Sequence, residues 1–254
     1  AAHAGANESD RFVKFAFNNT VHALANHWRP ALLSGDLTFT NTDHLQAVLK
    51  AYGGNDVAVV VRQQIDNPKL PIKQRQALLA LLAQTGNTTD AQLVLKRGST
   101  LPDVLDALSE SVQKRNLRPP RNAEKQLSAA IRNRNELVRA KAIQLAGLWK
   151  INSFKDHIVT EATDKNEPAT VRMAATEALG QLGGDIAIES LDRLAVLTEP
   201  ASVRAAAISG LAKLDLPKAA KHSAELLTKV NEIELGSILA AILQRNEGAD
   251  ALAG

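Results

Sequence analysis

The sequence predicts an all-α protein, specifically a right-handed α-solenoid of antiparallel helix pairs. The chain has 254 residues, of which 45% are hydrophobic and only 3% are aromatic, and Ala and Leu are abundant. Small aliphatic side chains favour closely packed helices over a β-sandwich, whose strands favour branched and aromatic residues. A similar segment also recurs at intervals of 33 and 32 residues, and such a period is typical of stacked helical repeats.

Three copies of the repeat begin with the dipeptide Val-Arg. They cover residues 138–149, 171–182 and 203–214. Each copy follows a polar lead that contains Asn, Glu, Pro, Thr or Ser, residues that favour the start of a helix. Apolar residues then recur every three or four positions, which predicts one buried stripe on each helix.

A second helix is predicted after each Val-Arg helix, over residues 154–163, 185–197 and 218–230. Gly183-Gly184 and Leu216-Pro217 serve as breaks between helices. One helix pair cannot cover its own apolar face, so neighbouring pairs must stack. We expect irregular N-terminal helical repeats over residues 1–122 and regular repeats over residues 123–254, joined in one continuous solenoid.

The composition and motifs argue against several classes of site. The chain has no Cys, so a disulfide, a thiolate zinc site, an iron–sulfur cluster and a CxxCH haem attachment are excluded. It contains no Gly-x-Ser-x-Gly motif, no P-loop and no His-Glu dipeptide. We therefore expect a non-enzymatic protein without a cofactor, and no membrane span, because no apolar run is long enough. No metal-binding spacing is found among the six histidines, His3, His22, His27, His44, His157 and His222.

The Val-Arg repeats resemble the short bacterial form of the HEAT-repeat family. The shared features are a polar or acidic turn, then Val-Arg, then a helix of small residues that ends near Leu-Gly, at a spacing of 32 to 33 residues. The resemblance covers residues 135–230 and weakens upstream, where segments such as 71–83 and 105–112 have helical spacing without Val-Arg. It implies a scaffold that binds a protein partner or acts as a spacer.

A narrower resemblance rests on residues 10–17, 28–32 and 145–150. These segments are similar to the HEAT-repeat middle region of large secreted haem proteins from planctomycete and verrucomicrobial bacteria. In that family a sugar-dehydrogenase-like β-propeller precedes the solenoid and a CxxCH cytochrome domain follows it. The resemblance implies a segment of a larger multidomain protein with redox neighbours, located in the periplasm or secreted. Neighbouring domains of the same parent chain would then be among its partners.

The Val-Arg arginines form the first set of candidate residues. Arg139, Arg172 and Arg204 recur at the same position of successive repeats, so stacking places them in a row. We interpret this row as a ladder of inter-repeat bridges, and an anion-binding row is the alternative. The expected partners are carboxylates in neighbouring turns, namely Glu136, Asp164, Glu167 and Glu199.

A second set lies on the solvent-facing side of the Val-Arg helices, which normally line the inner surface of a HEAT solenoid. Register alone selects six positions there as partner-binding residues. They are Lys141, Gln144, Thr176, Glu177, Ser209 and Lys213.

A basic segment at residues 114–141 suggests an alternative function. It contains nine basic and two acidic residues, a net charge of +7, whereas the whole chain carries +3. A basic strip on a solenoid can hold a phosphate backbone, as in some HEAT-like DNA glycosylases. The segment has no aromatic residue to stack on bases, which favours the protein scaffold. The candidate residues for nucleic-acid or other polyanion binding are Arg118, Arg121, Arg132 and Arg134.

Overall fold

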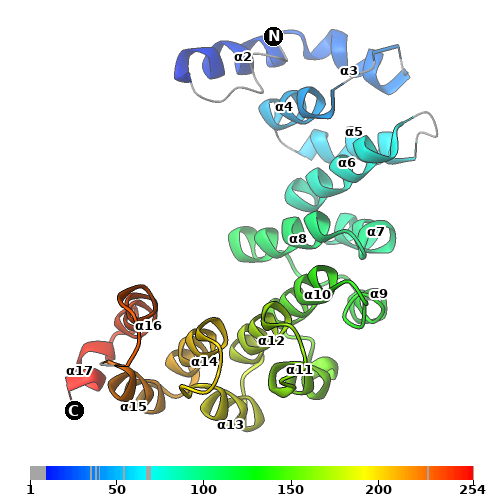
Figure 1. Cartoon of the computed structure of the whole chain (residues 1–254). Helices are drawn as coiled ribbons and strands as arrows, with labels where there is room; N and C mark the ends of the chain where they lie inside the picture. Colours follow the sequence, from blue (N-terminus) through cyan, green and yellow to red (C-terminus); the bar gives the residue numbers. More distant parts are fainter. Residues whose placement is uncertain are drawn as a thin grey trace. The chain divides into compact units, whose positions relative to one another are not determined.

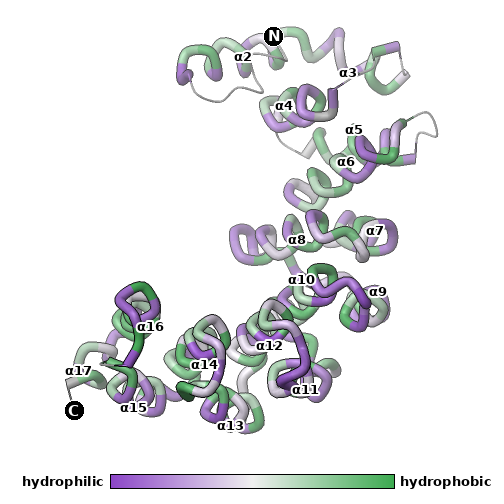
Figure 2. The backbone as a smooth tube through the Cα atoms, viewed as in Figure 1, coloured by the Kyte–Doolittle hydropathy of each residue, from purple (hydrophilic) through white to green (hydrophobic). Residues whose placement is uncertain are grey.

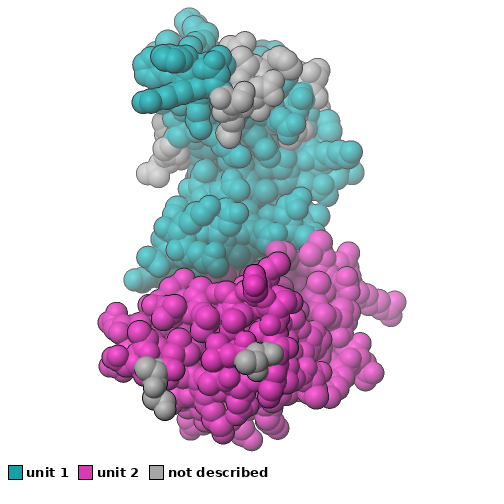
Figure 3. All heavy atoms as spheres, turned by 60° about the vertical axis from the view of Figure 1, so that its left-hand side comes forward, with its two compact units in different colours: residues 1–123 teal, residues 124–254 magenta. Residues whose placement is uncertain are grey.

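The computed structural model describes residues 10–34, 36, 37, 39, 41–53, 55–66, 70–227 and 229–253. Every secondary-structure element in this part of the chain is a helix, and within each unit helices pack on others close to them in the chain (Figure 1). The predicted all-α solenoid is thus confirmed. The contacts group the chain into two compact units, unit 1 over residues 1–123 and unit 2 over residues 124–254 (Figure 3).

In unit 1 the described helices do not begin with the Val-Arg signature, and the Val61-Arg62 dipeptide lies near the end of α5 rather than near a helix start. Within unit 1, α2 packs on α4, α4 on α6 and α6 on α8. The core of α6 and α8 is rich in fully buried leucines, including Leu78, Leu82, Leu105 and Leu108. The helices are α2 (Arg11–Ala23), α3 (Ala25–Ser34), α4 (Thr42–Tyr52), α5 (Asn55–Ile65), α6 (Ile72–Thr85), α7 (Thr88–Gly98) and α8 (Pro102–Arg115), and α9 (Ala123–Leu127) begins at the last residue of the unit.

Unit 2 contains the regular helix pairs. We call the first helix of each pair an A helix: α10 (Glu136–Leu148), α12 (Ala169–Leu182), α14 (Ala201–Leu214) and α16 (Glu232–Leu243). The second helices are the B helices: α11 (Lys155–Thr163), α13 (Asp185–Leu194), α15 (Leu216–Leu226) and α17 (Gly248–Ala253). The 3-10 turn η1 (Asn152–Phe154) precedes α11. The A helices pack in chain order, α10 on α12, α12 on α14 and α14 on α16.

The start of α15 and the end of α13 differ from the prediction. Leu216-Pro217 was expected to break the chain between helices, but both residues lie in the first turn of α15. The Asp215 side chain accepts a hydrogen bond from the Lys218 backbone nitrogen at 3.2 Å, and Pro fits the first turn because no helical partner is needed there. In addition, α13 ends at Leu194 rather than at residue 197.

Small residues let the A helices of unit 2 approach closely. A Cβ added at Gly147 would lie 2.6 Å from the Cα of Ala178, and one added at Gly180 would lie 2.9 Å from the Cα of Gly210. Such distances are shorter than van der Waals contact, so these positions admit only glycine without a shift of backbone. The contact therefore fixes how neighbouring A helices stack.

The hydropathy pattern agrees with stacked amphipathic helices. Apolar and polar residues alternate along the helices in Figure 2, and the residues buried in α10, α12 and α14 recur at helical spacing. Among the described helices, none combines the length and apolar character that crossing a membrane requires.

Candidate functional surface

The A helices of unit 2 begin at positions fixed by the polar leads. The side chain of Asn135 accepts hydrogen bonds from the backbone nitrogens of Leu137 and Val138, at 3.0 and 3.3 Å, and so caps α10. Pro168 and Pro200 occupy the residue before α12 and α14. Because each start is fixed, Val-Arg falls on the same turn of each helix.

This register places the three Val-Arg arginines beside carboxylates of the following repeat. Arg172 Nη2 lies 2.5 Å from Glu199 Oε2, and both side chains are more than nine-tenths buried. Arg204 Nη2 lies 2.5 Å from Glu234 Oε1, with both side chains 7% exposed. Carbonyl oxygens take further donors: Arg172 Nε donates to Ala162 at 3.0 Å, and Arg204 Nη1 donates to the Glu199 carbonyl at 2.7 Å. Each guanidinium thus connects two repeats.

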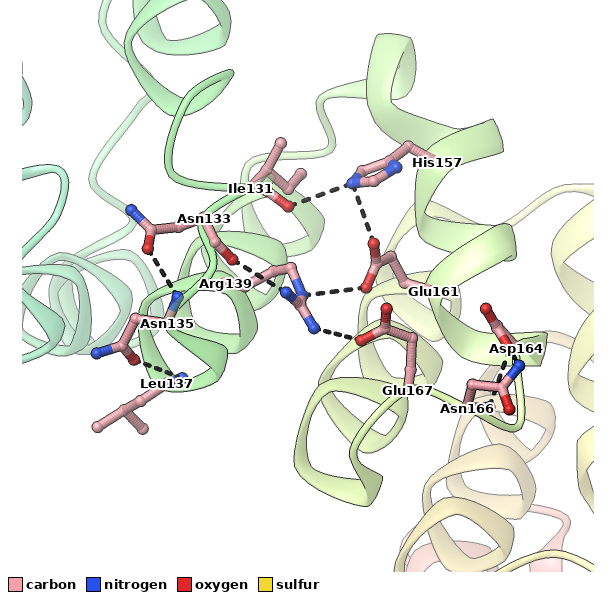
Figure 4. Close-up of polar contacts among 10 residues, drawn as sticks. All are labelled: Ile131, Asn133, Asn135, Leu137, Arg139, His157, Glu161, Asp164, Asn166 and Glu167. Atoms are coloured by element: carbon pink, nitrogen blue, oxygen red, sulfur yellow. Dashed lines mark hydrogen bonds and ion pairs between the residues drawn. The ribbon is translucent and has the colours of Figure 1, made fainter.

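The Arg139 bridge contains an additional carboxylate (Figure 4). Arg139 pairs with Glu167 of the next repeat, and its Nε lies 3.2 Å from Glu161 Oε2. His157 Nε2 lies 3.5 Å from Glu161 Oε1 and 3.2 Å from the carbonyl oxygen of Ile131. Burial raises the pKa of Glu161, and the neighbouring Glu167 raises it further, whereas Arg139 and His157 oppose the shift. This cluster is held together by opposite charges and connects α10, α11 and the turn before α12.

Only two of the four expected acidic partners take part in the ladder. Glu167 pairs with Arg139, and Glu199 pairs with Arg172. In the described part of the chain, Glu136 and Asp164 form no ion pair with these arginines. The sequence interpretation missed Glu234, which lies inside α16, and the spacing was the available signal. Glu234 follows Arg204 by 30 residues, close to the separations of 28 and 27 in the other two pairs.

A polar row runs across the A helices on a different side. We use this name for Lys141, Gln144, Glu177, Ser209 and Lys213, which come from α10, α12 and α14. Gln144, Glu177 and Ser209 occupy equivalent positions, 33 and 32 residues apart. Gln144 Nε2 donates to Glu177 Oε2 at 3.3 Å, which joins two repeats.

The charges of the polar row are coupled through Glu177. Burial raises the pKa of Glu177, while the positive charges of Lys213 and Lys141 and the hydrogen bond from Gln144 oppose this shift. Lys213 is exposed, and Lys141, Gln144, Glu177 and Ser209 are half-buried. The row therefore combines two cations with one carboxylate whose charged form is disfavoured by burial.

The structure corrects one of the six expected partner-binding positions. Thr176 was expected to face solvent, but its side chain is fully buried, and its hydroxyl donates to the Arg172 carbonyl oxygen at 2.8 Å. The equivalent residues of α10 and α14 are Ile143 and Ile208, which are also fully buried. This position thus lies against neighbouring helices in all three repeats, and a partner cannot reach Thr176 without rearrangement.

A hollow lies beside one end of the polar row. It has a volume of about 420 Å³ and is lined by the end of α14, the start of α15 and the segment after α16. Lys213 belongs to the row and also lines the hollow, together with Arg245 and Glu247. The hollow is a depression in the surface beside the polar row, and it is large enough for a partner side chain to insert.

The four candidate polyanion residues differ in their surroundings. Arg118 lines a cavity in unit 1, whereas Arg121, Arg132 and Arg134 are exposed and do not line it. Arg132 Nη1 donates to the Ser128 carbonyl oxygen at 3.4 Å. Two more cations of the basic segment are engaged, because Arg115 donates to carbonyl oxygens and Arg139 belongs to the ladder.

No cluster of three or more His, Asp or Glu side chains suited to a metal ion occurs among the residues that the structure describes. The polar clusters described above consist of hydrogen bonds and ion pairs between repeats. His3 lies outside the described residues.

Comparison with known families agrees with this geometry. Residues 123–212 match the family model for HEAT repeats. The matched stretch runs from α9 to Ala212 near the end of α14 and includes all three Val-Arg helices. The match shows similarity to HEAT repeats over this part of the chain, and repeats of this family are typical of protein-interaction scaffolds. No curated protein matches the chain.

Proposed function

We propose that the chain is a non-enzymatic scaffold that binds a protein partner through the polar row of unit 2. The observation that supports this most is that three successive A helices contribute to one electrostatically coupled set. Gln144 is hydrogen-bonded to Glu177, and Lys141 and Lys213 both act on the pKa of Glu177. Residues of a solenoid that repeat in register form an extended surface suited to a protein segment.

The charges indicate the chemistry of the partner. The polar row and the adjoining hollow together contain three cations, two lysines of the row and Arg245, and two carboxylates, Glu177 and Glu247. Because burial disfavours the charged form of Glu177, the surface favours an acidic partner segment. Such a segment would lie along α10, α12 and α14 and place a side chain in the hollow beside Lys213.

A charge reversal in the polar row tests this proposal. The full chain is immobilised and used to capture proteins from an extract of its native source, in three forms: wild type, Lys213→Glu and Lys221→Glu. Lys221 is an exposed lysine of the B helix α15, so it is a matched control for the change in charge. We expect a defined partner to bind the wild type and K221E and to be lost with K213E. Equal recovery by all three forms would contradict the polar row as the binding surface.

The alternative function, nucleic-acid binding, has weaker support. Arg139 is neutralised by Glu167, and the basic segment has no aromatic residue to stack on bases. Titration with duplex DNA at two salt concentrations distinguishes the two functions, because binding to phosphates weakens steeply with salt. Absence of DNA binding at low salt would contradict the nucleic-acid function. Strong binding that weakens with salt would contradict the scaffold proposal.

We also propose that the chain is a segment of a larger multidomain protein with redox neighbours, in the periplasm or secreted. The support is the resemblance of residues 10–17, 28–32 and 145–150 described above. The mass of the native polypeptide and its haem absorbance test this proposal. A native polypeptide of 27.2 kDa without haem would contradict it.

A further inference from the structure

Unit 1 contains a polar cavity that the scaffold function does not use. Its volume is about 530 Å³, which lies in the range typical of small-molecule sites. It is bounded by α5, the turn from α6 to α7 and the residues after α8. Its charged lining consists of three arginines and one carboxylate, namely Arg62, Arg115, Arg118 and Asp90.

Arg62 and Asp90 neutralise each other. Arg62 Nε lies 2.5 Å from Asp90 Oδ1, and its Nη2 donates to Asp90 Oδ2 at 3.0 Å. The hydrogen bond with Asp90 raises the pKa of Arg62. Asp90 also accepts from the backbone nitrogen of Asn87 at 2.8 Å, and its side chain is 2% exposed. This carboxylate is therefore fully engaged and contributes no net negative charge to the cavity.

Arg115 is fixed in place without a counter-charge. Its Nη1 and Nη2 both donate to the Gly86 carbonyl oxygen at 3.1 Å, and its Nη2 also approaches the Ala83 carbonyl oxygen at 3.4 Å. Carbonyl oxygens orient the guanidinium, but they carry no full charge. Within the described chain, Arg115 has no carboxylate partner, so its positive charge stays uncompensated.

Arg118 adds a second uncompensated charge. The backbone turns at Asn116, which has a φ of 54°, and the next residue, Leu117, is buried. These two residues anchor the segment that carries Arg118 to the cavity wall. Arg118 is exposed and forms no ion pair with any residue that the structure describes. With the Arg62–Asp90 pair neutral, the cavity carries a net charge of +2.

We propose that this cavity is a binding site for a phosphate monoester. A phosphate monoester carries a charge of about −1.5 to −2 at neutral pH, which matches the two uncompensated arginines better than a single carboxylate does. The planar guanidinium groups of Arg115 and Arg118 match the spacing of phosphate oxygens. The start of α7 adds little, because Asn87 already accepts from the backbone nitrogens of Thr89 and Asp90.

Calorimetric titration of the full chain at low ionic strength tests the site. The probes are inorganic phosphate, glycerol phosphate, a phosphoserine peptide and, as a carboxylate control, acetate. We expect saturable binding of the phosphate probes and weaker binding of acetate. If glycerol phosphate binds more tightly than the peptide, the natural ligand is a free ester, and the reverse order indicates a phosphorylated protein.

Two arginine variants separate this site from general attraction of anions. Arg118→Gln removes a charge from the cavity wall, and Arg121→Gln removes the same charge from an exposed neighbour that does not line the cavity. We expect R118Q to weaken phosphate binding by about tenfold or more, the effect of losing one charge-assisted contact, and R121Q to leave it unchanged. Arg118→Lys keeps the charge without the planar fork, so its affinity should lie between wild type and R118Q.

Three results would overturn the proposal. They are no saturable binding of any phosphate probe, acetate binding as tight as phosphate, and equal weakening by R118Q and R121Q. Should R118Q change the helical circular dichroism, R118K decides in its place. Wild-type affinity in R118K would then exclude the guanidinium fork as the recognition element.

Discussion

In unit 2, the A helices α10, α12 and α14 meet at glycine and alanine, whereas the packed helices α6 and α8 of unit 1 contain no glycine and pack through larger side chains such as Leu82 and Leu105. The paired arginines of the two units also differ in how far they are exposed to solvent. The arginines of the unit 2 pairs Arg172–Glu199 and Arg204–Glu234 are nearly fully buried, while the unit 1 arginine Arg62 is 41% exposed. Arg62 lies on α5 and pairs with Asp90 on α7, whereas the ladder arginines of unit 2 lie on the A helices.

This difference indicates that stacked helix pairs can be held in register by two kinds of interaction. Close backbone contact with buried Arg–Glu pairs allows few alternatives in sequence, so it leaves a repeated Val-Arg signature. Packing of large aliphatic side chains tolerates many substitutions of similar volume, so it leaves only helical periodicity. The family match begins at residue 123, close to the start of unit 2, as this difference leads one to expect.

The largest effect should come from removing a ladder arginine. Arg172→Met leaves Glu199 buried without its counter-charge, which should cost about 3–5 kcal/mol of the free energy of unfolding. Arg62→Met in unit 1 should cost less, about 1–3 kcal/mol, because Asp90 keeps its backbone hydrogen bond from Asn87. Urea unfolding measures both losses, and hydrogen exchange shows in which unit they occur. A greater loss in R62M than in R172M would contradict the comparison.

Adding one methyl group at a glycine distinguishes the two packing modes. Gly147→Ala should destabilise unit 2 by about 1–3 kcal/mol through overpacking, because the new Cβ meets the Ala178 backbone. In unit 1, the Cβ of Gly98→Ala would meet only the Val104 side chain at 3.0 Å, so a smaller loss is expected.

Gly236 of α16 is the control for these glycine variants. Apart from its chain neighbours and the backbone of its own helix, nothing lies within 4 Å of a Cβ added there, so Gly236→Ala should stabilise the helix by about 0.5–1 kcal/mol. Thermal unfolding of the three variants gives the order directly. Equal effects of G147A and G236A would show that the A helices do not touch at Gly147.

The pH dependence should differ between the units, because the described carboxylates with displaced pKa values, Glu161, Glu177 and Asp192, all lie in unit 2. Burial raises the pKa of Glu177 above its ordinary 4.5. The stability that a raised pKa contributes is present below the unfolded-state pKa and is lost as the pH rises through the folded-state pKa. The wild type should thus gain stability relative to Glu177→Gln on acidification from neutral pH towards 4.5. Urea unfolding of both proteins across this range measures the difference, and parallel pH profiles would contradict the raised pKa of the half-buried Glu177.

The smallest effect, of opposite sign, is expected at Asp192. The hydrogen bond with His222, whose Nε2 lies 2.7 Å from Asp192 Oδ1, lowers the pKa of Asp192 below its ordinary 3.8, and Lys218 adds to this. A lowered carboxylate pKa contributes stability that is lost as the pH falls through the folded-state value. Because Asp192 is partly exposed, the contribution should be at most about 1 kcal/mol. Asp192→Asn should therefore lose less stability than the wild type between about pH 5 and about pH 2, and a larger loss would contradict the pairing.

Much of the fold follows from sequence patterns in unit 2. The Val-Arg period locates α10, α12 and α14. Asn135 caps α10, Pro168 and Pro200 precede α12 and α14 without a side-chain cap, and Gly183 ends α12. The upstream helices have only helical spacing, so they were predicted without a register. Leu216-Pro217 was misread because Pro ends one helix and starts another with equal ease.

The site could be predicted only where register alone determines the environment. Gln144 and Glu177 lie at equivalent positions and do contact each other, but Thr176, which the register was taken to place on the solvent-facing side, is fully buried. Comparison with Ile143 and Ile208 at the same position would have predicted its burial.

The unit 1 cavity is lined in part by Arg62 and Asp90. Arg62 follows Val61 and precedes its partner by 28 residues, the same separation as in Arg139–Glu167. This Val-Arg dipeptide lies near the end of α5 rather than near a helix start, so the repeat pattern did not locate the cavity.

The most direct test of the ladder is a double-mutant cycle on Arg172 and Glu199. Urea unfolding would be measured for wild type, Arg172→Met, Glu199→Leu and the double variant. If the buried pair connects the repeats, the double variant should lose less stability than the two single losses together, by at least about 1.5 kcal/mol. The exposed pair Arg193–Glu189 should give a coupling below about 1 kcal/mol in the same experiment. Additive losses at Arg172 and Glu199 would contradict the ladder as the link between successive repeats.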